Sequence, residues 1–331
     1  MTSPFLLLLI FAISLLTLVK ASDFFTNSAE KLGLAMGLPP FIVGVTIVSI
    51  GTSLPELLSS LFGIFQGAPE VAVSNVVGSN IANICLVIGT AAIISKRTIR
   101  VLYDLVSVDL PLFMGSAFLF TLMAWDQTFS RGEALLLVIG YIMYLFYILK
   151  SSDEAASEVL TPQNYSEAET APTDEVVPPT SATDQMREGL ILLLSGIFIF
   201  LGAQYTIDSL IQISEVLNIG KEVIAVSAVA LGTSLPELIV TINAASKGKA
   251  EIAIGNVLGS NIFNIFVVIG IPGLIQPLPV PDAVIIPGLP TLISASLMTF
   301  FIAQDNKVTI WEGWLFIIFY AWFVGSVFNL L

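Results

Sequence analysis

The chain has 331 residues, of which 56% are hydrophobic and only 11% are charged. Soluble domains keep roughly a quarter of their residues charged, so this composition indicates a membrane protein. The formal charge of −13 includes no basic cluster that could meet phosphates, which excludes a nucleic-acid partner. The chain lacks histidine, which excludes histidine-based catalysis. It has one cysteine, which excludes an intrachain disulfide and a thiolate metal site. Neither an enzyme nor an organic cofactor is expected.

Apolar runs of about 20 residues, long enough to cross a bilayer, follow one another along the whole chain. The first, residues 4–32, is interpreted as a spanning helix rather than a signal peptide, because no basic residue precedes its apolar core. The pattern predicts an all-α polytopic membrane protein with ten transmembrane helices, over about 4–32, 40–66, 70–94, 103–124, 131–150, 188–216, 222–246, 250–274, 281–303 and 309–330.

A polar segment, residues 151–187, separates the fifth run from the sixth. It is rich in Ser, Thr, Pro, Ala and acidic residues, and it has too few large apolar side chains to offset the entropy of ordering. We expect a disordered acidic linker that divides the chain into two five-helix halves, residues 1–150 and 188–331. A regulatory arm is the alternative, but a solvated tether explains the composition by itself.

The distribution of basic residues predicts the orientation of the chain. Ten crossings place both termini on one side of the membrane, and cytoplasmic loops carry the excess of Lys and Arg. Termini outside and a cytoplasmic linker leave only Arg131 and Lys221 in outer loops. The inner loops then hold Lys31, Lys96, Arg97, Arg100, Lys150, Arg187, Lys247, Lys249 and Lys307.

The chain contains an internal duplication. The stretch Gly51-Thr-Ser-Leu-Pro-Glu-Leu57 recurs unchanged 181 residues later as Gly232-Thr-Ser-Leu-Pro-Glu-Leu238, and Gly78-Ser-Asn-Ile81 recurs as Gly259-Ser-Asn-Ile262 at the same offset. The two repeats cover about 40–94 and 222–274. Because an odd number of crossings separates them, they have opposite orientations in the membrane, an arrangement typical of transporters with a binding site near the bilayer midplane.

The repeated motif predicts a polar site inside the membrane. Pro55 and Pro236 should break helices 2 and 7, so that backbone carbonyls are freed and must face protein, water or an ion. Hydroxyls and a carboxylate then share one helix face in each repeat. These faces carry Ser49, Thr52, Ser53 and Glu56 in the first repeat, and Ala230, Thr233, Ser234 and Glu237 in the second.

A second polar stripe follows each motif. It comprises Asn75, Ser79 and Asn83 in the first repeat, and Asn256, Ser260 and Asn264 in the second, each at spacing i, i+4, i+8. Gly78 and Gly259 should let two helices approach closely. Where the inverted repeats cross, carboxylates, hydroxyls, amide oxygens and carbonyls should converge into an all-oxygen site for a hard cation.

Charge explains why such a site could exchange ions. An intramembrane carboxylate costs at least ~2.5–3.5 kcal/mol, and two neighbouring carboxylates repel, so one should hold a proton when no metal is bound. One Ca²⁺ neutralises Glu56 and Glu237 together, as do two monovalent ions. A single proline kink is usually structural, but the paired recurrence of a buried glutamate favours function. Glu70 and Glu251 lie at helix starts, where an interaction with the helix dipole is expected instead.

These motifs resemble the two α-repeats of the sodium/calcium exchanger family, within the calcium/cation antiporter superfamily, and in particular its prokaryotic type. The resemblance covers the ten-helix plan, the linker and both repeats. It implies a secondary active antiporter that exchanges Ca²⁺ for Na⁺ by alternating access in the plasma (inner) membrane of a prokaryote, in contact with lipid and without an obligatory protein partner. It further implies Ca²⁺ ligation by Glu56 and Glu237 with backbone oxygens of Thr52 and Thr233. Na⁺ would use Ser49, Ser53, Ser79, Ala230, Ser234 and Ser260, with Asn83 and Asn264 at the centre.

The sequence departs from the family pattern in two respects. Several members carry Asp where this chain has Asn264, which leaves two central carboxylates rather than three and argues against K⁺ coupling. The linker is also too short for the Ca²⁺-sensing domains of animal exchangers. The alternatives are an H⁺/Ca²⁺ exchanger of the same fold, which the many hydroxyls disfavour, and a Ca²⁺ channel, which the inverted repeat disfavours.

Overall fold

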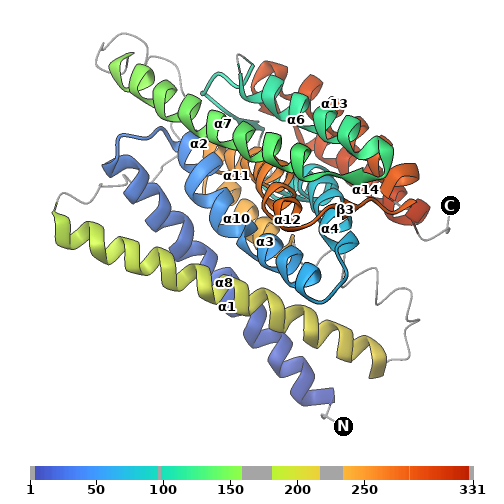
Figure 1. Cartoon of the computed structure of the whole chain (residues 1–331). Coiled ribbons are helices and arrows are strands. Elements are labelled where there is room, and N and C mark those ends of the chain that lie inside the picture. Colours follow the sequence, from blue (N-terminus) through green and yellow to red (C-terminus); the bar gives the residue numbers. More distant parts are fainter. Residues whose placement is uncertain are drawn as a thin grey trace.

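The computed structural model describes residues 4–95, 98–106, 108–158, 181–216, 234–282 and 284–327, which form an almost entirely helical protein (Figure 1). Eight helices in this part of the chain are long and apolar enough to cross a membrane, so the predicted all-α polytopic membrane fold is confirmed. Two predicted spans are not among the eight. One is represented by α6 (Asp109–Met123), which is shorter, and the other by α10 (Leu235–Ser246), whose preceding residues 217–233 lie outside the described ones.

The elements follow one another in two series. The first half contains α1 (Pro4–Ala35), α2 (Pro40–Val43), η1 (Gly44–Val48), α3 (Ser49–Phe65), α4 (Glu70–Ile81), η2 (Ala82–Ile88), α5 (Gly89–Ile94), β1 (Ile99–Arg100), α6, η3 (Ala124–Asp126), β2 (Thr128–Phe129) and α7 (Arg131–Glu158). The second half contains α8 (Ala182–Val216), α10, α11 (Ala250–Phe263), η4 (Asn264–Val268), α12 (Gly270–Ile275), β3 (Leu278–Pro279), η5 (Val284–Gly288), α13 (Leu289–Ile302), η6 (Ala303–Asp305), β4 (Lys307–Val308) and α14 (Ile310–Val327).

The predicted apolar runs agree with these helices to within a few residues, except at α6, at the linker, and at the start of the run predicted over 222–246, which lies outside the described residues. The prediction started the fourth span at residue 103, but Oε1 of Glu251 accepts the backbone N–H groups of Leu102 and Tyr103 at 3.0 and 3.1 Å and holds them in a loop. Helices α7 and α8 extend into the predicted linker, to Glu158 and from Ala182. Its two ends are therefore helical rather than disordered, since Ala and Glu favour helix. Residues 159–180 lie outside the described part of the chain.

The break predicted at Gly51–Pro55 has a different form. Helix α3 continues through this stretch with Pro55 inside it, and the irregularity is the π-helical turn η1, which directly precedes it. A proline in a membrane helix is tolerated when neighbouring helices support the backbone around it, and α11 packs against both η1 and α3. The matching residues 225–233 of the second repeat lie outside the described part of the chain.

Two short β-ribbons join the halves of the molecule. Strand β1 pairs with β4, and β2 pairs with β3, so that each antiparallel ribbon takes one strand from each half. Similar helix starts follow β2 and β4. The backbone N–H of Ser130 donates to Glu133, and the backbone N–H of Thr309 donates to Glu312. This recurrence of ribbon and capped helix agrees with a duplicated topology.

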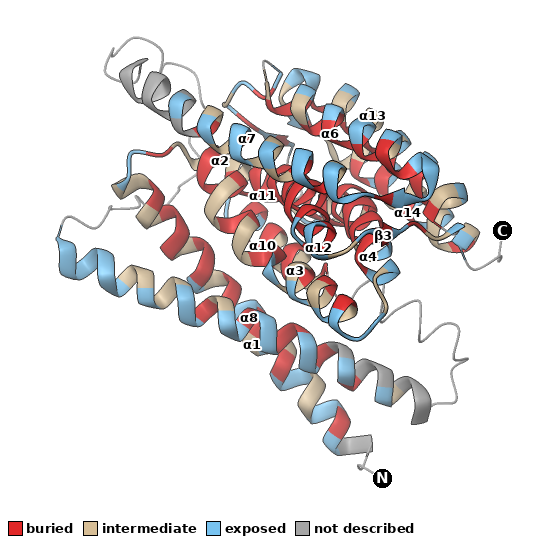
Figure 2. Ribbon diagram, viewed as in Figure 1, coloured by how far each residue is buried: buried red, intermediate tan, exposed pale blue. Residues whose placement is uncertain are grey.

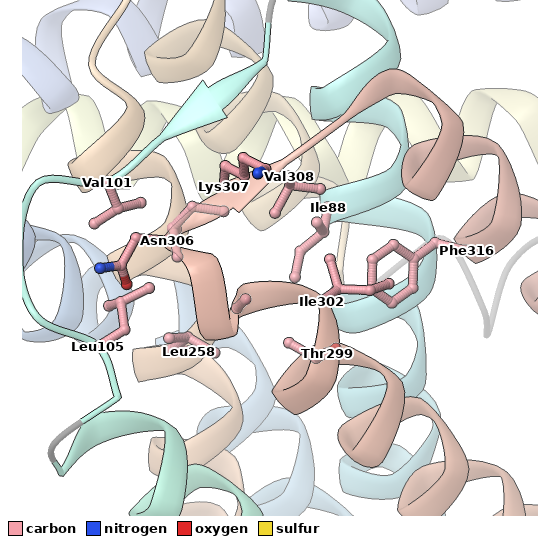
Figure 3. A pocket seen from close by; sticks show the side chains of 12 residues that line it. Ile88, Val101, Leu105, Leu258, Thr299, Ile302, Asn306, Lys307, Val308 and Phe316 are labelled. Atoms are coloured by element: carbon pink, nitrogen blue, oxygen red, sulfur yellow. The ribbon is translucent and has the colours of Figure 1, made fainter.

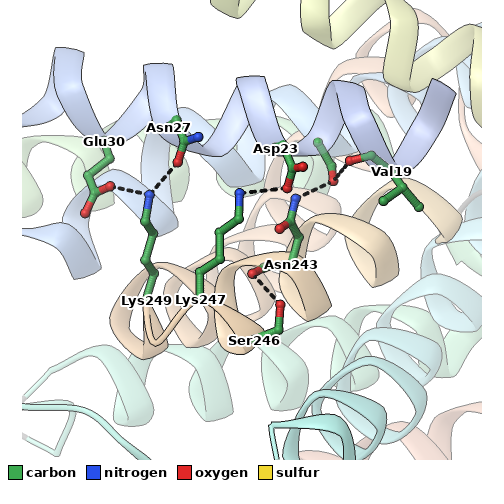
Figure 4. A network of polar contacts seen from close by, with 9 residues as sticks. Val19, Asp23, Asn27, Glu30, Asn243, Ser246, Lys247 and Lys249 are labelled. Carbon is green, nitrogen blue, oxygen red and sulfur yellow. Dashed lines mark hydrogen bonds and ion pairs between the residues drawn. The ribbon is translucent and has the colours of Figure 1, made fainter. Parts of the chain in front are cut away.

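Helices α1 and α8 form a long antiparallel pair along one side of the molecule, and much of α8 is exposed (Figures 1 and 2). Ion pairs fix the end of α1 that precedes α2. Lys31 binds Glu188 of α8 at 2.9 Å, while Lys247 and Lys249, in the turn between α10 and α11, bind Asp23 and Glu30 at 2.7 and 2.6 Å (Figure 4). At the centre of the main body lies the continuous segment α11–η4–α12, the most completely buried of the candidate spans.

Candidate functional site

The two repeats meet where α3 and the preceding turn η1 cross α11. Glycines make this crossing close: a Cβ atom on Gly44 would lie 2.6 Å from the backbone oxygen of Ile252, and one on Gly259 would lie 2.6 Å from Oγ of Ser49. The close approach predicted for Gly259 is therefore confirmed. No described atom lies within 4 Å of the corresponding position on Gly78. Side chains from both repeats consequently face one another across a short distance.

Glu56 and Glu237 are both fully buried on facing elements. Glu56 lies on α3 and Glu237 lies in the first turn of α10. Oγ of Ser53, one turn before Glu56, donates to Oε1 of Glu237 at 3.1 Å and so links the two repeats directly. Because Ser53 and Glu56 lie one turn apart on α3, this bond places Oε1 of Glu237 beside the helix that carries Glu56. Neither carboxylate forms an ion pair with a residue that the structure describes.

Seven of the fourteen buried side-chain polar atoms without a hydrogen-bond partner in the described structure belong to predicted site residues. They include both carboxylate oxygens of Glu56, Oε2 of Glu237, Oγ of Ser234 and Oδ1 of Asn264. Buried oxygens normally find a donor, because an unsatisfied one costs roughly 1–3 kcal/mol. A group of acceptors without donors is what a desolvated cation would satisfy.

A buried amide network also connects the two repeats. Nδ2 of Asn264 donates to Oδ1 of Asn80 at 3.0 Å, and Nδ2 of Asn80 donates to the backbone oxygen of Asn261 at 3.2 Å. Asn264 begins the π-helical turn η4, and Asn83 lies in the π-helical turn η2. Such turns occur frequently at functional sites. Sequence reasoning missed Asn80, although its recurrence as Asn261 in the duplicated Gly-Ser-Asn-Ile motif was a usable signal.

Hydroxyls and amides also bridge α3, α10 and α11. Oγ1 of Thr52 donates to Oδ1 of Asn256 at 3.1 Å and lies 3.5 Å from Oγ of Ser260, and Nδ2 of Asn256 donates to Thr241 at 2.9 Å. Asn75 similarly donates to Oγ of Ser59 at 3.1 Å. Asn75 and Asn256 thus hold helices together, which places them around the site rather than among its cation-facing oxygens.

The structure buries every predicted site residue that it describes. They lie on α3, α4, η2, α10, α11 and η4, with Ser234 directly before α10: Ser49, Thr52, Ser53, Glu56, Ser79, Asn83, Ser234, Glu237, Ser260 and Asn264. The hydroxyl of Ser49 donates to the backbone oxygen of Val45 in its own helix, a contact that apolar helices commonly contain. Two further predicted residues, Ala230 and Thr233, lie outside the described residues.

A small enclosed pocket beneath the β1–β4 ribbon is a separate feature (Figure 3). Its walls are mainly apolar, with side chains such as Ile88, Leu258 and Phe316, and its volume of about 10 Å³ has room for little more than one water molecule. It includes neither glutamate. We regard it as a packing defect rather than a binding site.

Known proteins are similar to this chain in sequence and in architecture. The sequence model of the family described as sodium/calcium exchanger protein matches residues 6–150 and 188–329. The chain is 34% identical to the sodium/calcium exchanger MaX1 of Methanosarcina acetivorans, over 97% of this chain and 98% of that protein. It is 32% identical to the inner membrane protein YrbG of Escherichia coli, over 80% of this chain and 78% of that protein. A solved structure of the sodium-calcium exchanger NCX_Mj, soaked with zero Na⁺ and Ca²⁺, is similar with a TM-score of 0.81 and 27% identity, and the match covers 98% of this chain and 100% of that one.

Proposed function

Because the chain belongs to the sodium/calcium exchanger family, we propose that it exchanges Ca²⁺ for Na⁺ by alternating access, with both ions competing for Glu56 and Glu237. The observation that carries this proposal is a pair of buried carboxylates, one from each repeat, three of whose four oxygens accept no described hydrogen bond. Two such groups without a cationic partner are costly inside a membrane. A transported cation removes that cost.

The donor set suits hard cations. Described residues contain no cluster of three or more His, Cys, Asp or Glu side chains that could hold a metal, so the two carboxylates are supplemented by neutral hydroxyl and amide oxygens. Ca²⁺ accepts six to eight such oxygens in flexible geometry. One Ca²⁺ or two monovalent ions balance the two negative charges equally well, which makes simultaneous occupation unfavourable and exchange possible.

Neutral oxygens favour Na⁺ over H⁺ as the exchanged ion. Protons need only the two carboxylates, whereas Na⁺ needs several oxygen ligands, and Ser53, Ser234 and Ser260 supply hydroxyls beside the glutamates. The amide of Asn264 leaves the centre with two acidic groups, which supports a site without K⁺.

We place the protein in the plasma membrane of a prokaryote with its termini outside. The bias of Lys and Arg towards the inner loops supports this orientation. One relative comes from Methanosarcina acetivorans, and the one from E. coli is named an inner membrane protein. Both support the assignment to the plasma membrane of a prokaryote.

Transport into proteoliposomes tests the proposal. Vesicles loaded with Na⁺ and diluted into Na⁺-free medium with ⁴⁵Ca²⁺ should accumulate the isotope, and collapse of the Na⁺ gradient should stop uptake. Vesicles with a pH gradient alone, and vesicles loaded with K⁺, are the matched controls and should take up little.

Each alternative function predicts a different result. Uptake driven by the pH gradient alone would assign H⁺/Ca²⁺ exchange instead. A Ca²⁺ conductance that does not depend on the ion on the opposite side would assign a channel. Either result contradicts the proposed Na⁺ coupling.

A further inference from the structure

An open groove lies between α1 and α8, and neither glutamate lines it. Both helices carry many exposed residues (Figure 2). The volume of the groove is about 550 Å³. The walls are formed by Leu16 and Phe24 of α1 and by Leu194 and Phe198 of α8, whose side chains are 45–64% exposed. In a protein that spans a membrane, an exposed apolar groove of this kind faces lipid acyl chains.

One charged residue, Lys20, lines this groove. The long apolar run of α1, residues 5–19, precedes Lys20, and Asp23, one turn after Lys20, binds Lys247 in the turn between α10 and α11. Lys20 therefore lies at the border between the hydrocarbon and the polar region of the membrane. A lysine at this depth lays its methylene stem along apolar surface and directs its ammonium group to the headgroups.

Lys20 forms no ion pair in the described part of the protein, although its charge acts through space on Asp23, one turn further along α1. Lys20 is also exposed. The nearest acidic residue along α1, Asp23, is bound by Lys247 at 2.7 Å (Figure 4). An external anion can therefore bind Lys20 without displacing an existing ion pair.

The hydroxyl groups of the other polar side chains in the groove already donate hydrogen bonds within their own helices. Oγ1 of Thr17 donates to the backbone oxygen of Ile13 at 2.8 Å, and Oγ of Ser195 donates to that of Ile191 at 2.6 Å. Lys20 is thus the donor of the groove that no described contact occupies. It is charged, so it would form the stronger, charge-assisted type of hydrogen bond with a phosphate.

We propose that this groove binds a phospholipid with a net negative headgroup, whose acyl chain lies between α1 and α8 and whose phosphate binds Lys20. Charge complementarity selects this occupant over two others. A second copy of the chain docked through the same surface by a two-fold axis would add a second lysine rather than an anion. A zwitterionic lipid offers its phosphate together with a cationic group. The proposal is independent of the exchange reaction, since none of the residues that line the groove belongs to the glutamate site.

Lipid binding to the purified full chain in detergent, measured by native mass spectrometry, tests this proposal. Phosphatidylglycerol is the probe, with phosphatidylcholine and inorganic phosphate as comparison ligands. We expect Lys20→Gln to weaken phosphatidylglycerol binding about fivefold, which corresponds to about 1 kcal/mol, and to leave phosphatidylcholine binding unchanged. Lys20→Arg keeps the charge and should retain binding.

Lys150→Gln is the matched control. Lys150 is likewise an exposed lysine on a helix, α7, but it does not line the groove. Leu194→Trp fills the groove and should weaken binding of both lipids, with an unfolding midpoint near that of the native protein. Equal phosphatidylglycerol binding by the native protein and Lys20→Gln overturns the proposal, as does equal weakening by Lys150→Gln. Formation of a dimer that excludes lipid, or competition by inorganic phosphate, also overturns it.

Discussion

Asn264 of the second repeat donates a 3.0 Å hydrogen bond to Asn80 of the first, and this bond sets the direction in which the Asn264 side chain presents its oxygen. Asn80 is fixed in turn by its own donation to the backbone of Asn261. Oδ1 of Asn264 is left without a described partner. The related amide of Asn83 has no described partner on either atom. Asn261, the counterpart of Asn80, donates to the backbone oxygen of Val257 in its own helix, and its Oδ1 accepts no described hydrogen bond. The two central amides are therefore held unequally.

The Asn80–Asn264 bond predicts that Asn80 positions the site without touching the ion. Asn80→Ala removes the acceptor of the Asn264 amide, and we expect the apparent Ca²⁺ affinity to fall about threefold to tenfold, the range for one buried hydrogen bond. Asn261→Ala is the control, since Asn80 uses only the backbone oxygen of that residue. The half-saturating Ca²⁺ concentration in ⁴⁵Ca²⁺ uptake measures both effects. Equal losses in the two variants contradict the positioning role.

The two buried glutamates provide a second prediction. Glu56→Gln and Glu237→Gln each remove one negative charge, so Ca²⁺ is no longer neutralised, and we expect transport to be abolished. Both variants should still insert and fold, because a neutral amide costs less to bury than a carboxylate. Glu70→Gln is the control, since Glu70 is exposed at the start of α4. Transport near the native rate in both site variants would remove the glutamates from the proposal.

The hydroxyls beside the glutamates should matter more to Na⁺ than to Ca²⁺. Ser53→Ala and Ser260→Ala remove neutral oxygens while both carboxylates remain, so we expect a higher Na⁺ requirement and a smaller change in Ca²⁺ affinity. Titration of uptake against internal Na⁺ and external Ca²⁺ separates the two. Ser74→Ala, on the exposed side of α4, should change neither value. A loss confined to Ca²⁺ affinity contradicts this assignment.

The close crossing of η1 and α11 predicts a stability effect. A methyl group at position 259 would meet the backbone oxygen of Val45 and Oγ of Ser49, so Gly259→Ala should destabilise the protein by about 1–3 kcal/mol through overpacking. Gly115→Ala is the control, because no described atom lies within 4 Å of the added carbon. Thermal unfolding in detergent, followed by tryptophan fluorescence, compares the two. A lower midpoint for Gly115→Ala alone would show that the crossing is looser than the structure indicates.

Much of the fold could be predicted because membrane helices are encoded by simple apolar runs. The duplicated motifs similarly indicated which buried polar residues would meet, and the Ser53–Glu237 contact across the repeats agrees with this. The π-helical turn η1 could not be predicted, because proline indicates strain in a helix but not where its neighbours absorb that strain. The loop before α6 depends on a carboxylate from α11, more than a hundred residues away, and local sequence carries no information about such a contact.

The β1–β4 and β2–β3 ribbons join one half of the protein to the other by backbone pairing at two places. Separating the halves would break this backbone pairing. We therefore expect the body that carries both glutamates to keep its shape when the site opens to one side of the membrane and then to the other. Ions arriving from either compartment would then encounter the same coordinating atoms. Any difference in affinity between the two sides would have to originate in parts that the ribbons do not hold.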